Sequence, residues 1–187
     1  MGCHTWHYTL LDPQPTYEEC KQYLLKNIDE VIDLLNGKYS FKDDGTESDE
    51  YLKEMMDMWL EEITAYWGSK ERAILYHEKV REKIKNDRTP EAIKKRYKPI
   101  GKGVRYFKGK FYTYKYDGAL WDVFRVHNYP DDTLTCYEDF EQFWNTHKCY
   151  PGIKSVGGDW VDMTEEDVKE KMKKFWEDHP DGIVDFG

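Results

Sequence analysis

The residues best suited to bind a charged ligand lie between positions 102 and 126, where cationic and aromatic side chains alternate. Lysines and arginines can hold phosphates while neighbouring aromatic rings stack on bases, so this pattern predicts a site for a small anionic, nucleotide-like ligand. A half-buried hairpin with lysines on its exposed edge would give the same pattern. The candidate ligand-binding residues are Lys102, Arg105, Lys108, Lys110 and Arg125, with Trp6 and Tyr8 from the first segment.

Arg125 stands between apolar neighbours, which indicates a partly buried guanidinium. A buried guanidinium needs an anionic or carbonyl partner. Two interpretations stay open: a structural ion pair with Asp122, or an arginine whose planar fork grips a phosphate or carboxylate. A separation of three residues places Asp122 and Arg125 on opposite faces of a regular strand.

Histidine and aspartate side chains offer an alternative, metal-based chemistry at His4, His77 and Asp122. These residue types bind zinc and similar divalent transition metals, so the alternative function is a metal-dependent hydrolase of phosphoesterase type. Strand alternation places His4 and His7 on opposite faces, and His77 lies on an apolar helix face, as core histidines commonly do. The leading hypothesis therefore includes no cofactor.

The sequence contains none of the common catalytic motifs. It has no G-x-x-x-x-G-K-[ST] phosphate loop, no G-x-S-x-G nucleophile elbow and no H-E-x-x-H pair. Carboxylates are so numerous that no catalytic pair stands out. We therefore favour a non-enzymatic binding protein.

Charge is unevenly distributed along the chain. Residues 70–116 hold sixteen Lys or Arg and five Asp or Glu, a net of +11, while residues 1–69 and 117–187 carry −10 each. One interpretation is mutual neutralisation of basic and acidic surfaces; the other is a cationic cleft for an anion. The acidic flanks disfavour binding of extended duplex nucleic acid. They also suggest a further alternative, an acidic inhibitor that mimics nucleic acid.

Composition and periodicity predict an α+β domain over residues 1–187. A 16% aromatic content is ample for a core, and no apolar run approaches the ~20 residues of a membrane span. We expect five or six helices packed on a small, mostly antiparallel sheet. The expected strands are residues 2–10, a meander over 103–126 and an edge strand over 182–187, whereas 148–160 is expected to be a loop. The expected helices are 16–36, 48–67, 70–86, 90–98, 135–144 and 164–178. Thr16 with Glu19 and Thr135 with Glu138 are expected to cap two of them, Thr164 is expected to begin the last, and Lys108-Gly109-Lys110 is expected to form a hairpin turn.

The termini resemble small accessory proteins of tailed bacteriophages. The similarity lies in the opening MGCHTW, the closing PDGIVDFG, and the DVFRV stretch that is followed by Asn128-Tyr129-Pro130. In that group a histidine often precedes the aspartate, where this chain has Trp121, which weakens a metal role for Asp122. The resemblance implies an origin, a protein acting in the cytoplasm of an infected bacterium, and no activity. The expected partners are a small anionic ligand or a host bacterial protein, and no membrane. By sequestering either partner, the protein is expected to counteract a defence of the host.

Overall fold

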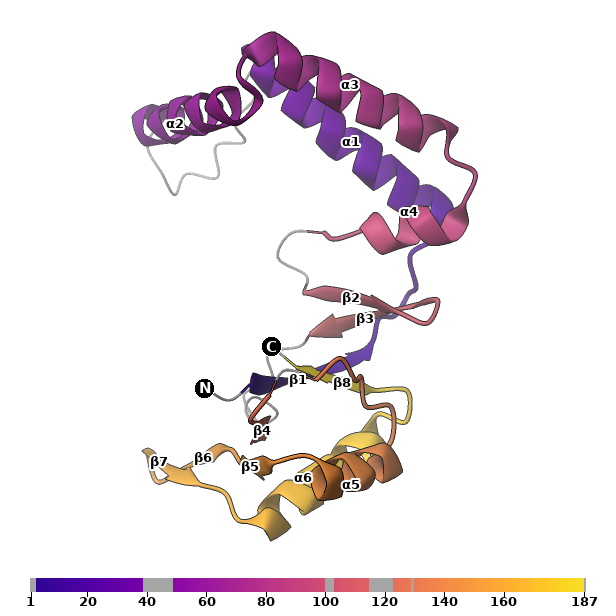
Figure 1. The fold of residues 1–187 in the computed structure, drawn as a ribbon, viewed down its shortest axis with the longest axis vertical. Helices are drawn as coiled ribbons and strands as arrows, with labels where there is room; N and C mark the ends of the chain where they lie inside the picture. Colours follow the sequence, from indigo (N-terminus) through magenta and orange to yellow (C-terminus); the bar gives the residue numbers. More distant parts are fainter. Residues whose placement is uncertain (1–2, 39–48, 100–102, 115–122, 129, 187) are drawn as a thin grey trace. The chain divides into compact units, whose positions relative to one another are not determined.

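The computed structural model describes residues 3–38, 49–99, 103–114, 123–128 and 130–186 (Figure 1). It has an α+β fold with six helices and antiparallel strand pairs, which confirms the predicted class. The chain divides into two compact units. A helical unit spans residues 15–97, and a strand-rich unit combines residues 1–14 with residues 98–187. The single domain remains a prediction, because compact units of this kind occur within one domain as well as between two.

The helical unit consists of four helices, and each forms where its periodicity predicts it. Helix α1 begins with the predicted capping box, in which the Thr16 hydroxyl accepts from the Glu19 amide at 3.2 Å and the Glu19 carboxylate accepts from the Thr16 amide at 2.7 Å. Gly37, at φ +77°, follows the end of this helix. The helices are α1 (Tyr17–Leu35), α2 (Asp49–Trp67), α3 (Lys70–Asn86) and α4 (Pro90–Arg96).

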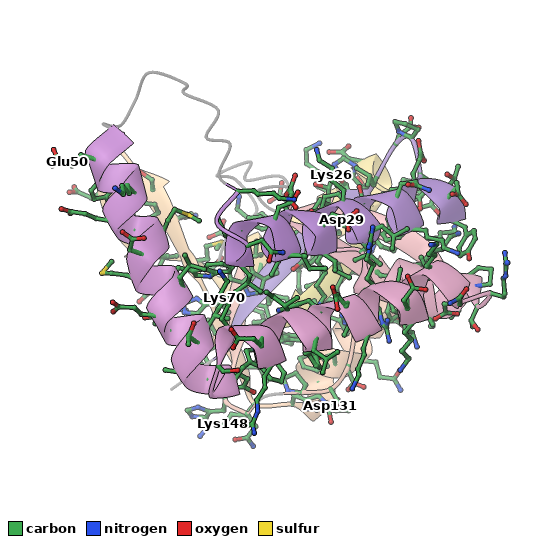
Figure 2. The ribbon with its side chains drawn as sticks, turned by 90° about the horizontal axis from the view of Figure 1, so that it is seen from above. Lys26, Asp29, Glu50, Lys70, Asp131 and Lys148 are labelled. Carbon is green, nitrogen blue, oxygen red and sulfur yellow. The ribbon has the colours of Figure 1, made fainter. Side chains whose placement is uncertain are left out.

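Helices α1 and α3 lie side by side and supply most of the buried residues of this unit (Figure 2). The Tyr17 hydroxyl donates to the Asp87 carbonyl at 2.7 Å, and Arg81 forms an ion pair with Asp29 at 2.8 Å. These contacts join α1 to α3 and to the residue that follows it, one at a half-buried point and one at an exposed point. The buried apolar residues of the unit include Cys20, Leu35, Ala73, Ile84 and Ile93.

The strand-rich unit contains a six-stranded antiparallel sheet in the order β2-β3-β1-β4-β5, with β8 also paired to β1. The predicted hairpin turn at Lys108-Gly109 is confirmed. The contiguous three-stranded meander is wrong, because β1 lies between β3 and β4. Turn residues report only local connections, and they carry no information about a distant strand that inserts between two neighbours. The strands are β1 (Cys3–Leu10), β2 (Val104–Phe107), β3 (Lys110–Tyr114), β4 (Phe124–Val126), β5 (Cys149–Pro151) and β8 (Ile183–Phe186).

Two helices, α5 (Tyr137–Thr146) and α6 (Glu165–Asp178), contribute to the main hydrophobic core of this unit. Thr164 caps α6 as predicted, through a capping box with Asp167. The predicted pairing of Thr135 with Glu138 is wrong: the Thr135 amide and hydroxyl both donate to Asp139, because the helix begins one residue later. The core includes Val123, Phe124, Val126, Leu134, Phe140, Phe143, Met163, Val168, Met172, Phe175, Trp176 and Val184.

Residues 148–160 are not the predicted loop. They contain β5 and most of a separate hairpin of β6 (Ile153–Val156) and β7 (Asp159–Asp162). Gly157 and Gly158 have φ +62° and +96°, which is the geometry of the two-residue turns that join adjacent strands. The glycines therefore mark a hairpin turn rather than an irregular segment.

Candidate functional site

Strand β1 has one buried face and one half-buried face. Thr5 and His7 are 0% and 3% exposed. The His7 Nε2 atom lies 3.4 Å from the Met172 sulfur, and its ring packs edge-on against Phe175 at 5.2 Å. Both partners belong to α6, so this helix covers that face. The predicted alternation is therefore observed from His4 to Tyr8, and His7 is a core residue.

The opposite face of β1 carries His4, Trp6 and Tyr8, which are half-buried. Directly paired residues of an antiparallel sheet project to the same side, so the strand register identifies their neighbours. Tyr8 lies opposite Tyr114, Trp6 opposite Asp185, and His4 opposite Arg125. We call this side of the sheet the aromatic face. Its members are His4, Trp6, Tyr8, Arg105, Lys110, Tyr112, Tyr114, Arg125, Tyr150 and Asp185.

The centre of the aromatic face is built from rings. The Tyr114 ring makes edge contacts with Trp6 at 5.0 Å and with Tyr8 at 5.9 Å between centroids. Gly103, at φ +50°, lies against this group: a β-carbon there would be 3.1 Å from the Tyr114 β-carbon. A side chain at position 103 would therefore be both strained and crowded, and glycine leaves Tyr114 in place.

An ion pair crosses the aromatic face beside Tyr8. The Arg105 Nε atom lies 2.7 Å from an Asp185 carboxylate oxygen, and the Thr133 hydroxyl lies 3.3 Å from the other oxygen of that carboxylate. Burial raises the pKa of Tyr8, and the nearby Asp185 charge raises it further, while Arg105 acts in the opposite sense. The Tyr8 phenol is therefore protonated at neutral pH and can donate a hydrogen bond.

The hairpin cations are partly neutralised. Lys110 lies 3.8 Å from an Asp181 carboxylate oxygen. Lys108, at φ +45° in the turn, places its ammonium group 5.1 Å from the centroid of the Phe107 ring. The basic segment is also divided, because residues 70–97 belong to the helical unit and residues 98–116 to the other unit. Lys102 lies outside the described residues.

Arg125 is half-buried, as predicted. Its strand runs between β1 and β5, and the register places Arg125 between His4 and Tyr150. Five predicted binding residues therefore share the aromatic face: Trp6, Tyr8, Arg105, Lys110 and Arg125. Sequence reasoning missed Asp185 and Tyr150. Asp185 could have been identified from the sequence, because it is the one acidic residue in the otherwise apolar strand β8.

The candidate metal ligands His4, His77 and Asp122 are not brought together in the described part of the chain. His4 lies on β1 and His77 on α3, in different units, and Asp122 lies outside the described residues. Burial lowers the pKa of His77. No cluster of three or more His, Cys, Asp or Glu suited to a metal ion occurs in the described part of the chain. The metal-dependent hydrolase stays a prediction.

Comparison with known proteins gives no match. No protein-family model fits the chain, and no curated protein and no solved structure is significantly similar to it. Among the residues that the structure describes, no helix combines the length and the apolarity needed to cross a membrane.

Proposed function

We propose that this chain is a binding protein that holds a small anionic ligand with a planar ring, of nucleotide type, on the aromatic face. The single observation that carries the proposal is the convergence of Trp6, Tyr8 and Tyr114 with Arg105 on one side of the sheet. Rings of this kind stack on bases, and arginine binds phosphate through a planar fork.

Each part of the aromatic face has a distinct role in this proposal. Trp6 and Tyr114 supply ring surface for the planar part of the ligand. Arg105 and Arg125 supply charge, and the protonated Tyr8 phenol supplies a neutral donor. Asp185 keeps the Arg105 guanidinium oriented while the site is empty, at the cost of competing with the ligand for it.

Calorimetry with adenosine monophosphate and cyclic nucleotides tests the proposal. We expect Arg105→Ala and Arg125→Ala each to weaken binding about tenfold or more, the loss of a charge-assisted hydrogen bond. The control is Lys173→Ala, an exposed cation of α6. The proposal fails if no anionic ligand binds, or if both arginine variants bind as the wild type does.

A second variant separates recognition by Arg105 from nonspecific attraction. Asp185→Asn removes the competing carboxylate, and we expect tighter nucleotide binding. Inorganic phosphate, which lacks a ring, should bind more weakly than the nucleotide to every variant. Equal affinity for phosphate and nucleotide would show that the aromatic rings do not contribute to binding. Because the termini resemble those of phage proteins, we propose that the ligand is a nucleotide signal of a bacterial host.

A further inference from the structure

Helix α2 carries a row of large apolar side chains on its exposed side. Tyr51 is 49% exposed, Met55 44%, Met58 54% and Tyr66 81%. The spacings of four, three and eight residues place these side chains along one side of a helix. We call Tyr51, Met55, Met58 and Tyr66 the α2 stripe.

A neighbouring side of α2 makes the contacts with its own unit. Met56, Trp59, Ile63 and Trp67 are half-buried, and the Trp67 ring stacks on Tyr76 of α3 at 4.2 Å. Figure 2 shows α2 joining the α1–α3 pair near Lys70, with Glu50 at its far end. The contacts within the unit therefore use one side of α2 and leave the α2 stripe outward.

Acidic residues border the α2 stripe. The helix holds six Asp or Glu and one Lys. Glu54 and Glu61 are exposed beside the stripe, and Glu62 is exposed within it, between Met58 and Tyr66. Methionine side chains adapt to irregular apolar surfaces, which suits a surface that meets a partner. The acidic border makes the preferred partner a positively charged one.

We propose that the α2 stripe is the docking surface for another protein, one that presents an apolar groove or helix face bordered by Lys and Arg. A second copy of this chain is the weaker occupant. Its own α2 is equally acidic, and the whole chain carries −9, so two such surfaces repel. The proposal is independent of ligand binding on the aromatic face.

Two synthetic amphipathic helices of about 18 residues, five turns, serve as probes. Both have the same leucine stripe, and the polar positions are all Lys in one peptide and all Glu in the other. Fluorescence anisotropy at near-physiological salt measures binding to the full chain. We expect the Lys peptide to bind and the Glu peptide not to bind.

Matched variants assign the binding to the stripe. Met55→Gln/Met58→Gln keeps good helix formers and should raise the Kd of the Lys peptide at least about tenfold. Leu75→Gln, on α3 and 51% exposed in the wild type, should leave the Kd unchanged. Glu54→Gln/Glu61→Gln should weaken binding and reduce its dependence on salt. Circular dichroism confirms that each variant keeps its helices.

Three results would overturn the proposal. The first is equal binding of the Lys and Glu peptides, which would remove the charge preference. The second is an unchanged Kd in the Met55→Gln/Met58→Gln variant, which would place the contact elsewhere. The third is a wild-type dimer in light scattering that this double variant converts to monomer, because a second copy would then cover the stripe.

Discussion

The aromatic face and the α2 stripe both expose large side chains, but they hold them differently. On the aromatic face, Trp6, Tyr8 and Tyr114 are fixed by cross-strand pairing and ring contacts, and an ion pair crosses the same side. On α2, Met55 and Met58 extend from a single helix into solvent. Rigid, mixed-polarity groups suit a small ligand that must be oriented. Flexible apolar groups with a charged border suit a large partner.

Substitutions in the core beneath the sheet and in the α2 stripe should differ most in their effect on the free energy of unfolding. Phe124 is 0% exposed and packs against the rings of Phe140, Phe143, Trp144 and Phe186. Replacing it with Ala leaves a cavity beneath the sheet, and we expect a loss of ~3–5 kcal/mol in the free energy of unfolding. Urea denaturation measures the change. A loss below about 1 kcal/mol would show that the sheet is not supported by this core.

Gly182 tests whether the turn before β8 is as tightly packed as the core. A β-carbon at this position would lie 2.6 Å from the Phe175 ring and 3.0 Å from the His179 carbonyl oxygen. Phe175 is 2% exposed and has little room to move. We expect Gly182→Ala to cost ~1–3 kcal/mol in the free energy of unfolding, as overpacking does. Wild-type stability of this variant would contradict the close approach.

Asp167 gives a pH-dependent test of the strand-rich unit. Its pKa is lowered from 3.8 to about 2, first by the Lys154 ammonium at 2.6 Å and then by the Thr164 amide at 2.9 Å. Because the pKa is lowered, the ionised Asp167 carboxylate stabilises the fold above pH 3.8, and this contribution disappears as the pH falls towards 2. We therefore expect wild type to be more stable than Asp167→Asn at about pH 5, with the difference shrinking on acidification. A difference that does not change with pH would contradict these contacts.

The smallest effect is expected on α2. Met58 is 54% exposed, so Met58→Gln should change the free energy of unfolding by no more than ~0.5 kcal/mol, as exposed substitutions do. Peptide binding should respond to the same side chain. A loss of stability comparable with that of Phe124→Ala would mean that the α2 stripe supports the fold instead of facing a partner.

Local signals predicted most elements of this fold. Thr16 with Glu19, and Thr164 followed by an apolar period, mark helix starts that the structure confirms. The errors concern pairing between distant segments. Nothing within residues 103–126 indicates that β1 separates β3 from β4, because that arrangement depends on the register of Tyr8 with Tyr114.

The candidate site also depends on pairing between distant segments, which the sequence did not predict. The cationic and aromatic residue types were identified, but their shared face follows from the pairing of β1 with β3, β4 and β8. Asp185 lies far from Arg105 in sequence, so the ion pair of these two residues could not be predicted from spacing. The Gly157-Gly158 hairpin was predictable, since two consecutive glycines between alternating residues favour such a turn.

The most direct test of the account is the indole N–H signal of Trp6 in a nitrogen–proton correlation spectrum, recorded while adenosine monophosphate is added. Trp6→Phe assigns the signal, and Trp160, which is 66% exposed on β7, is the internal control. The account predicts a saturable shift of the Trp6 signal that requires at least about tenfold more nucleotide in Arg105→Ala, with Trp160 unmoved. A shift confined to Trp160, or a Trp6 signal that stays in place while nucleotide binds, would contradict ligand binding on the aromatic face.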